Sequence, residues 1–175
     1  MNVMSTSLSA EADVLRWGYA VGYFDKSDIE LWADRKIAAT EKPCLELLDL
    51  SMIRHTHPLD VMKLLRSLGT SDPATTVETQ IGFLGLLYGR QEITAYRAIC
   101  ELYALVNEAG ITADQESEIY DLDDAFDAAV AGTFGTMNDF ERKLTGFLSP
   151  YAEQLAERHS QLIPALRTRR GKENG

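Results

Sequence analysis

Apolar residues recur along this chain at the three- and four-residue spacing of an α-helix, and residues that favour helix ends separate the segments. The stretch from Asp25 to Leu68 shows this most clearly, because it divides into three short segments with separate start signals. Asp25 is suited to cap the first segment, and Pro43 and Pro58 suit the first turns of the next two. One face of the first segment holds four apolar residues, Ile29, Trp32, Ala33 and Ile37. The pattern predicts three short helices that form a corner on which other helices pack.

The rest of the chain carries the same signals, such as the Asp72-Pro73 start and the capping box of Thr112 and Gln115. No run of alternating apolar and polar residues predicts a strand. The predicted helices cover approximately residues 10–23, 25–37, 43–52, 58–68, 73–88, 91–109 and 112–131, with a last long segment after 136. The predicted fold class is all-α, an irregular multi-helix bundle of about seven to eight helices.

Two of these segments are predicted to be deeply buried. The third helix has Leu45, Leu48 and Met52 on one side, widened by Leu47 and Leu50, and so broad an apolar arc predicts burial. The fifth helix is apolar nearly all round in its second half, which predicts a central place in the core.

Glycines in helical segments predict where backbones approach each other. Gly82, Gly85 and Gly89 each cost roughly 1 kcal/mol relative to alanine inside a helix. Their presence in the fifth segment predicts close approach of another backbone, or a helix end near Gly89. Gly18 and Gly22 form a G-x-x-x-G spacing in the first helix, which likewise predicts close packing of a neighbour.

The sixth and last segments carry more specific expectations. Pro150 lies inside the last segment, where its ring clashes with the carbonyl of Gly146, so we expect a kink or a break with Ser149 as a new cap. The sixth helix is expected to present one side made of Tyr96, Ile99, Cys100, Tyr103 and Val106.

Composition suits one folded domain. The chain has 175 residues, of which 45% are hydrophobic, and a formal net charge of −10. The predicted plan is a frayed N-terminus at 1–9, a single helical domain at 10–166 and a basic disordered tail at 167–175. Net negative charge disfavours binding to nucleic acid and to anionic membranes, and it favours a basic protein partner.

Nothing in the sequence predicts secretion or a membrane span. Residues 1–12 lack the basic and apolar regions of a signal peptide, and the apolar run at 81–88 is far shorter than the ~20 residues that a span needs. Cys44 and Cys100 are the only cysteines and form no disulfide framework, so the expected compartment is the cytoplasm.

The most unusual feature is electrostatic, because no Lys or Arg lies between Arg97 and Arg142. An apolar arc of the seventh helix is expected to face the core, namely Ile119, Leu122, Phe126, Ala129 and Val130. Five acids on the remaining surface are the candidate partner-binding residues, Asp114, Glu118, Asp121, Asp124 and Asp127. Such a surface steers a basic partner towards itself. The alternative is the solvated face of an acidic protein.

Sites for metals and catalysis are weakly supported. An EF-hand loop counted from Asp121 would need glycine and glutamate where the chain has Phe126 and Gly132. His55 and His57 are too few for a zinc site, which needs three or four ligands. The sequence contains no nucleophile elbow, P-loop or zincin motif. We therefore predict no catalytic residue, no cofactor and no metal.

Aromatic residues concentrate near the end of the first helix. They either fill the core or act as interface anchors and pocket lining. The group comprises Trp17, Tyr19, Tyr23, Phe24 and Trp32.

The segment W-A-D-R-K-I, with P-C-L-E-L-L-D-L-S after it, lies within Leu31 to Ser51 and resembles segments of small acidic all-helical bacterial proteins of uncharacterised or immunity type. The resemblance implies no site residue. The first functional hypothesis is a non-enzymatic, immunity- or regulator-like interaction protein that binds a basic partner through its acidic helical face. The alternatives are a helical ligand-binding domain or enzyme with an aromatic-lined pocket, and a homo-oligomeric helical scaffold.

Overall fold

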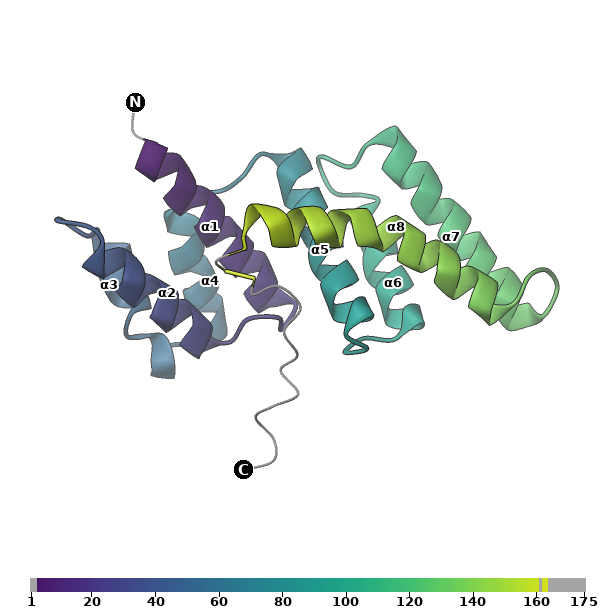
Figure 1. The fold of residues 1–175 in the computed structure, drawn as a ribbon, viewed down its shortest axis with the longest axis horizontal. Coiled ribbons are helices and arrows are strands. Elements are labelled where there is room, and N and C mark those ends of the chain that lie inside the picture. The colour runs from purple at the N-terminus through teal and green to yellow at the C-terminus, as the bar shows by residue number, and fades with distance from the viewer. Residues whose placement is uncertain (1–2, 161, 164–175) are drawn as a thin grey trace.

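The computed structural model describes residues 3–160 and 162–163, with side chains from Leu8 onwards, and this part of the chain is all-helical as predicted (Figure 1). It contains eight α-helices, one short 3₁₀ helix and no strand. The helices are α1 (Val3–Ala20), α2 (Lys26–Ala38), α3 (Leu45–Leu50), η1 (Ile53–His55), α4 (Pro58–Ser67), α5 (Pro73–Gly89), α6 (Ala95–Leu105), α7 (Ala113–Ala131) and α8 (Met137–Arg158).

Most helix starts follow from local capping chemistry. Asp25, Thr112 and Thr136 each form a capping box at the start of α2, α7 and α8, so donors at both ends of the first turn are satisfied. His57 caps α4 through its ring nitrogen Nδ1, which accepts a hydrogen bond from the Leu59 amide at 3.3 Å. Pro43 departs from expectation, because α3 begins only at Leu45.

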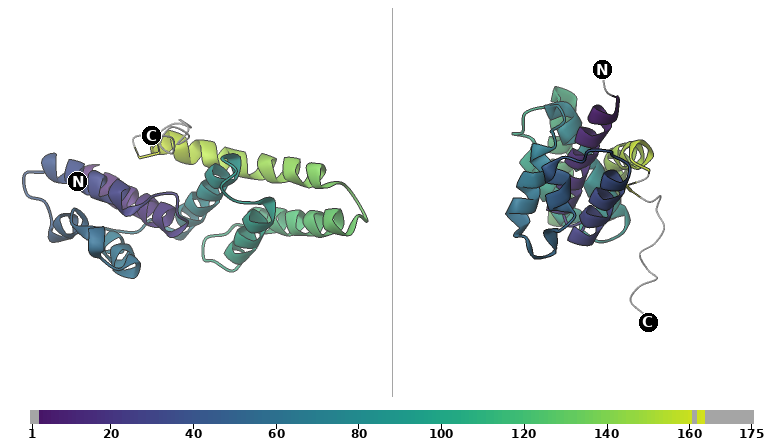
Figure 2. Two further views of the ribbon diagram at one scale, coloured as in Figure 1. Left: turned by 90° about the horizontal axis from the view of Figure 1, so that it is seen from below. Right: turned by 90° about the vertical axis from the view of Figure 1, so that its left-hand side faces the viewer.

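The apolar side chains form two clusters joined by α5 and α8. The first cluster lies among α1, α2, α3 and α4, and the second lies among α6, α7 and the first part of α8. Phe83 of α5 belongs to the first cluster, whereas Ile81 and Leu84 belong to the second. The predicted central position of α5 is therefore confirmed. The two groups of helices give the molecule an elongated shape, in which α5 lies between them and α8 runs along α7 and across α5 (Figures 1 and 2).

Close approach of backbones is also confirmed, at the contact of α5 with α8. A Cβ at Gly82 would lie 3.0 Å from the Tyr151 carbonyl oxygen, and a Cβ at Gly85 would lie 2.9 Å from that of Leu148. In α1, Gly18 gives room to the rings of Phe24 and Phe83. Gly22 instead sits in the following turn with a positive φ of 79°, so the G-x-x-x-G spacing is not a single packing face.

The expected burial of α3 is wrong on one side. Leu47 and Leu50 are buried, but Leu45, Leu48 and Met52 are 68%, 38% and 71% exposed. The helix has only six residues and packs on α2 and α4 at one end of the molecule, so its other side meets no helix of the described chain.

Pro150 does not break the last helix. The α-helix α8 is continuous from Met137 to Arg158, and Ser149 begins no new helix. Pro150 is exposed, and Gly146, whose carbonyl loses its usual partner, is exposed as well. The lost hydrogen bond therefore faces water, which can satisfy the carbonyl, rather than the apolar core.

The N-terminal end differs from the domain organisation that was predicted. The helix α1 begins at Val3, ahead of the expected start at Ala10. The proposed basic tail, 167–175, lies outside the described residues.

Candidate functional site

The five predicted partner-binding carboxylates all lie on the exposed surface of α7. Within the described chain, no ion pair involves any of them. The residues are Asp114, Glu118, Asp121, Asp124 and Asp127. Their position follows from the apolar side of α7, where Ile119 and Leu122 are buried in the second cluster. Val130, expected on that side, is instead 64% exposed, because it lies in the last turn of α7, next to the loop.

The five acids do not form one stripe. At 100° per residue, Asp114, Glu118 and Asp121 fall on the flank of α7 that faces α8. Glu118 and Asp121 line a shallow cavity of about 380 Å³ together with Lys143 and Phe147 of α8. The positive charge of Lys143 therefore lies beside this flank and partly offsets its negative charge.

The other flank of α7 faces α6, and it carries Asp127 together with Asp123 and Glu116. Asp123 is half-buried, and its pKa is raised by desolvation, then by the charges of Asp127 and Asp124. The ionised form of the Asp123 carboxyl is therefore less favourable than that of an isolated aspartate. Asp124 lies between the two flanks and points outwards.

Three exposed tyrosines of this region were not predicted as surface residues. Tyr96 and Tyr103 of α6 and Tyr120 of α7 are all exposed, whereas Ile99 of α6 and Val106, which follows the helix, are buried. The expected side of α6 was therefore misplaced. Its buried stripe runs through Ala98, Ile99, Leu102 and Val106. Tyrosine at the edge of such a stripe covers apolar surface with its ring and keeps its hydroxyl in water.

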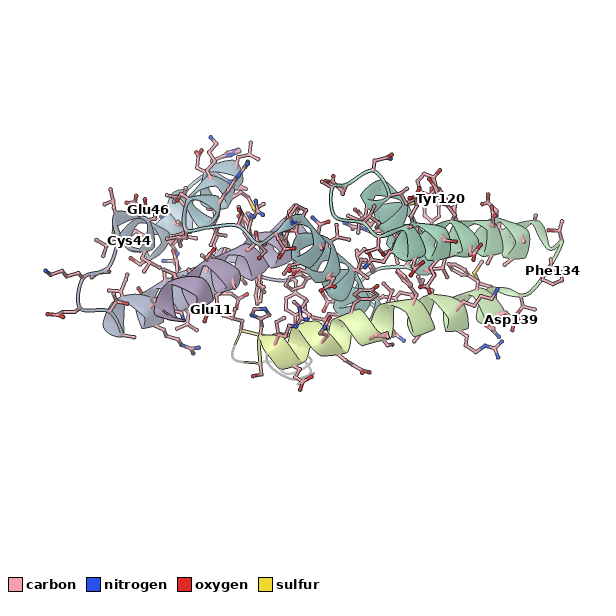
Figure 3. All side chains as sticks on the ribbon, turned by 90° about the horizontal axis from the view of Figure 1, so that it is seen from above. Glu11, Cys44, Glu46, Tyr120, Phe134 and Asp139 are labelled. Carbon is pink, nitrogen blue, oxygen red and sulfur yellow. The ribbon has the colours of Figure 1, made fainter. Side chains whose placement is uncertain are left out.

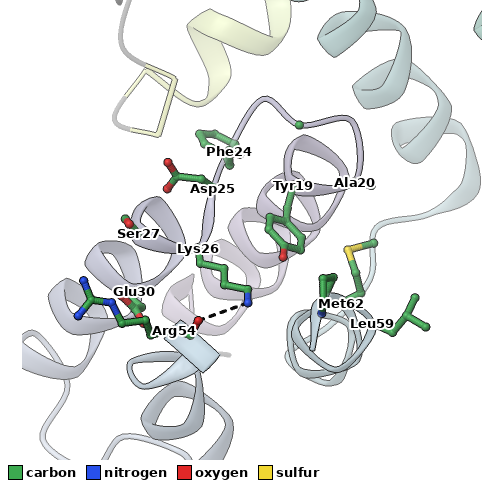
Figure 4. A pocket seen from close by; sticks show the side chains of 12 residues that line it. Tyr19, Ala20, Phe24, Asp25, Lys26, Ser27, Glu30, Arg54, Leu59 and Met62 are labelled. Atoms are coloured by element: carbon green, nitrogen blue, oxygen red, sulfur yellow. Dashed lines mark hydrogen bonds between the residues drawn. The ribbon is translucent and has the colours of Figure 1, made fainter. Parts of the chain in front are cut away.

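An open groove of about 900 Å³ lies at the other end of the molecule, between the end of α1, the start of α2 and α4. Tyr19, Lys26 and Met62 point into it (Figure 4). Lys26 donates hydrogen bonds to the carbonyl oxygens of Thr56 at 2.6 Å and Arg54 at 3.4 Å. Burial raises the pKa of the Tyr19 hydroxyl. The groove can hold an amphipathic molecule.

Two of the charged side chains of the groove are engaged in contacts within the fold. Asp25 at its edge is already engaged in capping α2, through the amide of Asp28 at 3.0 Å. Lys26 holds two carbonyl oxygens, and Arg54 and Glu30 add charges of opposite sign. No histidine and no cysteine lines it. The described contacts of Asp25 and Lys26 therefore hold the helices that form the groove.

The remaining sequence candidates fall into structural roles. Tyr23, Phe24 and Trp32 are buried in the first cluster, while Trp17 and Tyr19 pack at its edge. The described residues contain no group of three or more potential metal ligands, and Cys44, His55 and His57 are exposed.

A charged residue that the sequence did not single out lies in the core. Asp13 of α1 is 1% exposed, pairs with Arg16 and accepts a hydrogen bond from the Ser71 amide at 3.3 Å. The carboxylate ties α1 to the loop between α4 and α5, so its role is structural. At the sequence level Asp13 and Arg16, three residues apart, resemble an ordinary surface pair.

No protein-family model, curated protein or solved structure matches this chain. Among the described helices, none has the length and apolar character required to cross a membrane.

Proposed function

We propose that this protein is a non-enzymatic interaction domain of the cytoplasm that binds a basic protein partner through the acidic surface of α7. The observation that supports the proposal is the exposure of Asp114, Glu118, Asp121, Asp124 and Asp127 without an ion pair to any described residue. Unpaired carboxylates on one helix create a negative potential that speeds encounter with a positive surface.

The contacts that hold α7 in the fold do not involve its exposed acids. The helix is fixed by its capping box and by the side chain of Gln115, whose Nε2 donates to the Tyr151 hydroxyl at 3.0 Å. Its apolar residues pack in the second cluster, so the exposed acids are free to serve binding. Removing them should not unfold the protein.

The test is a triple variant, Asp121→Asn, Asp124→Asn and Asp127→Asn, compared with a control triple variant at the other end of the molecule. Asp34→Asn, Glu41→Gln and Asp49→Asn remove the same charge from exposed acids of α2, α3 and the loop between them. A partner is first isolated by affinity capture and crosslinking with the wild-type protein. Its association rate is then measured for each variant at two salt concentrations.

The α7 variant should associate more slowly and with weaker salt dependence than the wild type. The association rate of the control variant should fall much less, because its substituted residues lie far from the acidic surface of α7. Equal rates for both variants and the wild type would contradict the proposal.

A second candidate function is the binding of a small amphipathic ligand in the groove. The observation that favours it is the combination of Tyr19 and Met62 with Lys26 around a cavity of about 900 Å³. Ligand pockets commonly join apolar walls with a few polar groups. A screen of amphipathic compounds by thermal shift tests it, with Met62→Asp as the variant that should abolish any stabilisation.

Light scattering in the same preparation measures whether the chain forms an oligomer, as the scaffold hypothesis requires.

A further inference from the structure

Three exposed tyrosines lie along the seam between α6 and α7, at two separate ring contacts. Tyr96, Tyr103 and Tyr120 are 63%, 44% and 41% exposed. Tyr96 and Tyr103 are seven residues apart on α6 and so share one side of that helix. In Figure 3, Tyr120 lies on the side of α7 opposite to α8. The surface is therefore separate from the cavity that contains Lys143.

The rings pair across the two helices. Tyr103 and Tyr120 have ring centroids 5.8 Å apart in an edge-to-face arrangement, with an interplanar angle of 73°. Tyr96 lies beside Phe126 of α7, also with centroids 5.8 Å apart. These contacts hold the rings in place before any partner arrives, so little side-chain freedom is lost on binding.

The charges around the rings on α7 are all negative. Glu116, Asp123 and Asp127 are placed four residues before, three residues after and seven residues after Tyr120, which puts them on the same flank of α7. Desolvation and the charge of Glu116 raise the pKa of Tyr120, which agrees with this proximity. On α6 the nearby base is Arg97, which pairs with Glu101 at 3.7 Å. An excess of carboxylates therefore remains beside the rings.

We propose that this face, formed by Tyr96, Tyr103 and Tyr120 with Glu116, Asp123 and Asp127, binds an arginine-bearing segment of the basic partner. The inference rests on the proposed function and names the side-chain chemistry that the acidic surface selects. A guanidinium group stacks on an aromatic ring and also offers paired N–H donors to a carboxylate. Lysine has a compact charge without a planar fork, so it uses the carboxylates but gains less from the rings.

The occupant follows from charge complementarity. A negatively charged polymer or membrane would be repelled by Glu116, Asp123 and Asp127. An apolar segment would cover the rings but leave these carboxylates desolvated and unpaired, which is costly. An arginine side chain can stack on the tyrosine rings and pair with the carboxylates at the same time. It would also relieve the repulsion between Asp123 and Asp127, which adds to desolvation in raising the pKa of Asp123.

The experiment uses the full chain and three synthetic peptides of one sequence, in which the basic positions are arginine, lysine or the neutral analogue citrulline. Affinities are measured by isothermal titration and by chemical-shift mapping of the tyrosine side chains. The arginine peptide should bind more tightly than the lysine peptide, and the citrulline peptide should not bind measurably.

Two sets of variants locate the binding surface. Tyr103→Leu with Tyr120→Leu should weaken the arginine peptide by roughly fivefold to tenfold and remove most of its advantage over lysine. Tyr103→Phe with Tyr120→Phe keeps the rings and should retain binding. The control for an exposed aromatic residue elsewhere is Phe134→Leu in the loop between α7 and α8, which should have no effect. Circular dichroism checks that each variant is folded.

The two flanks of α7 supply the second comparison. Glu116→Gln, Asp123→Asn and Asp127→Asn should weaken the arginine peptide much more than Asp114→Asn, Glu118→Gln and Asp121→Asn, although both triples remove the same charge. Equal losses on both flanks, with no effect of the leucine variants, would overturn the aromatic site while leaving the acidic-surface proposal intact. Absence of binding by the arginine peptide to the wild type would also overturn it. The kinetics with the captured partner test the acidic surface separately.

Discussion

Gly85 of α5 and Ala152 of α8 are so close that a Cβ placed on Gly85 would lie 2.9 Å from the Cβ of Ala152. The same Cβ would lie 2.9 Å from the carbonyl oxygen of Leu148, which is a backbone atom and cannot move without moving α8. The absence of a side chain at Gly85 therefore sets the distance between the two helices that join the clusters.

We expect Gly85→Ala to lower the free energy of unfolding by about 1–3 kcal/mol, the usual cost of excess volume in a packed core. Gly146→Ala is the matched control, because Gly146 is also inside a helix but has nothing within 4 Å of the new Cβ. It should stabilise the protein by up to about 1 kcal/mol through helix propensity alone. Urea denaturation of both variants measures the difference. A stabilising Gly85→Ala would show that α5 and α8 are not in close contact.

Two neighbouring residues of α3 provide a second test of the core. Leu47 is 2% exposed and Leu48 is 38% exposed. Leu47→Ala should cost about 2–5 kcal/mol, as should Leu84→Ala in α5, because both leave cavities. Leu48→Ala should cost less than about 1 kcal/mol, in contrast to the burial expected from sequence. Chemical denaturation midpoints of the variants measure these stability losses. A large loss for Leu48→Ala would mean that the outer side of α3 is covered in solution.

Much of this fold could be predicted from local sequence, because a cap and an apolar stripe are properties of a few adjacent residues. Asp25, Asp72 and Thr112 cap the helices that they were expected to cap. The side that a short helix buries depends on its neighbours, so the outer leucines of α3 could not be placed. The effect of Pro150 likewise depends on which side of α8 meets water.

The candidate surface was predicted only in part, for the same reason. The acids of α7 were expected on the surface because its apolar arc is unambiguous at Ile119 and Leu122. Their division into two flanks depends on α6 and α8, which contribute Tyr103 and Lys143 from distant parts of the sequence. The tyrosines of α6 were grouped on one side with Ile99 and Val106, and the sequence does not separate them from the buried residues because an amphipathic ring fits both sides of a helix.

The side chain of Gln115 performs two tasks at the start of α7. Its Oε1 accepts from the Thr112 amide at 2.9 Å, and its Nε2 donates to the Tyr151 hydroxyl at 3.0 Å. We expect Tyr151→Phe to cost about 1 kcal/mol and Gln115→Leu to cost more, since it loses the cap as well. In a double-mutant cycle, Tyr151→Phe should cost less in the Gln115→Leu background. Fully additive losses would indicate that the two side chains do not interact.

The last prediction concerns the pH dependence of stability at two acids with opposite pKa shifts. The pKa of Asp123 is raised above its ordinary value of 3.8 by desolvation, and then by Asp127 and Asp124. The pKa of Asp139 is lowered, mainly by hydrogen bonds from the side chain and backbone of Thr136, with Arg142 contributing. A raised folded pKa favours the protonated form, so Asp123 loses its stabilising contribution as the pH rises through that pKa. A lowered pKa acts in reverse, so Asp139 contributes above 3.8 and loses its contribution as the pH falls through its folded value.

Asp123→Asn should therefore raise the melting temperature at pH 7, and this gain should shrink as the pH is lowered towards 4. Asp139→Asn should lower the melting temperature at pH 7. This decrease should persist at pH 4 and become smaller only below pH 3.8, the ordinary pKa of aspartate. Thermal melts monitored by circular dichroism between pH 7 and the acid limit of folding measure both curves. The two variants remove the same charge from neighbouring helices, so any effect of net charge is common to them and the difference between the curves reports the local environments. A change of the same sign at pH 7 in both variants would show that net charge, rather than the cap of α8 and the crowding on α7, determines their effect.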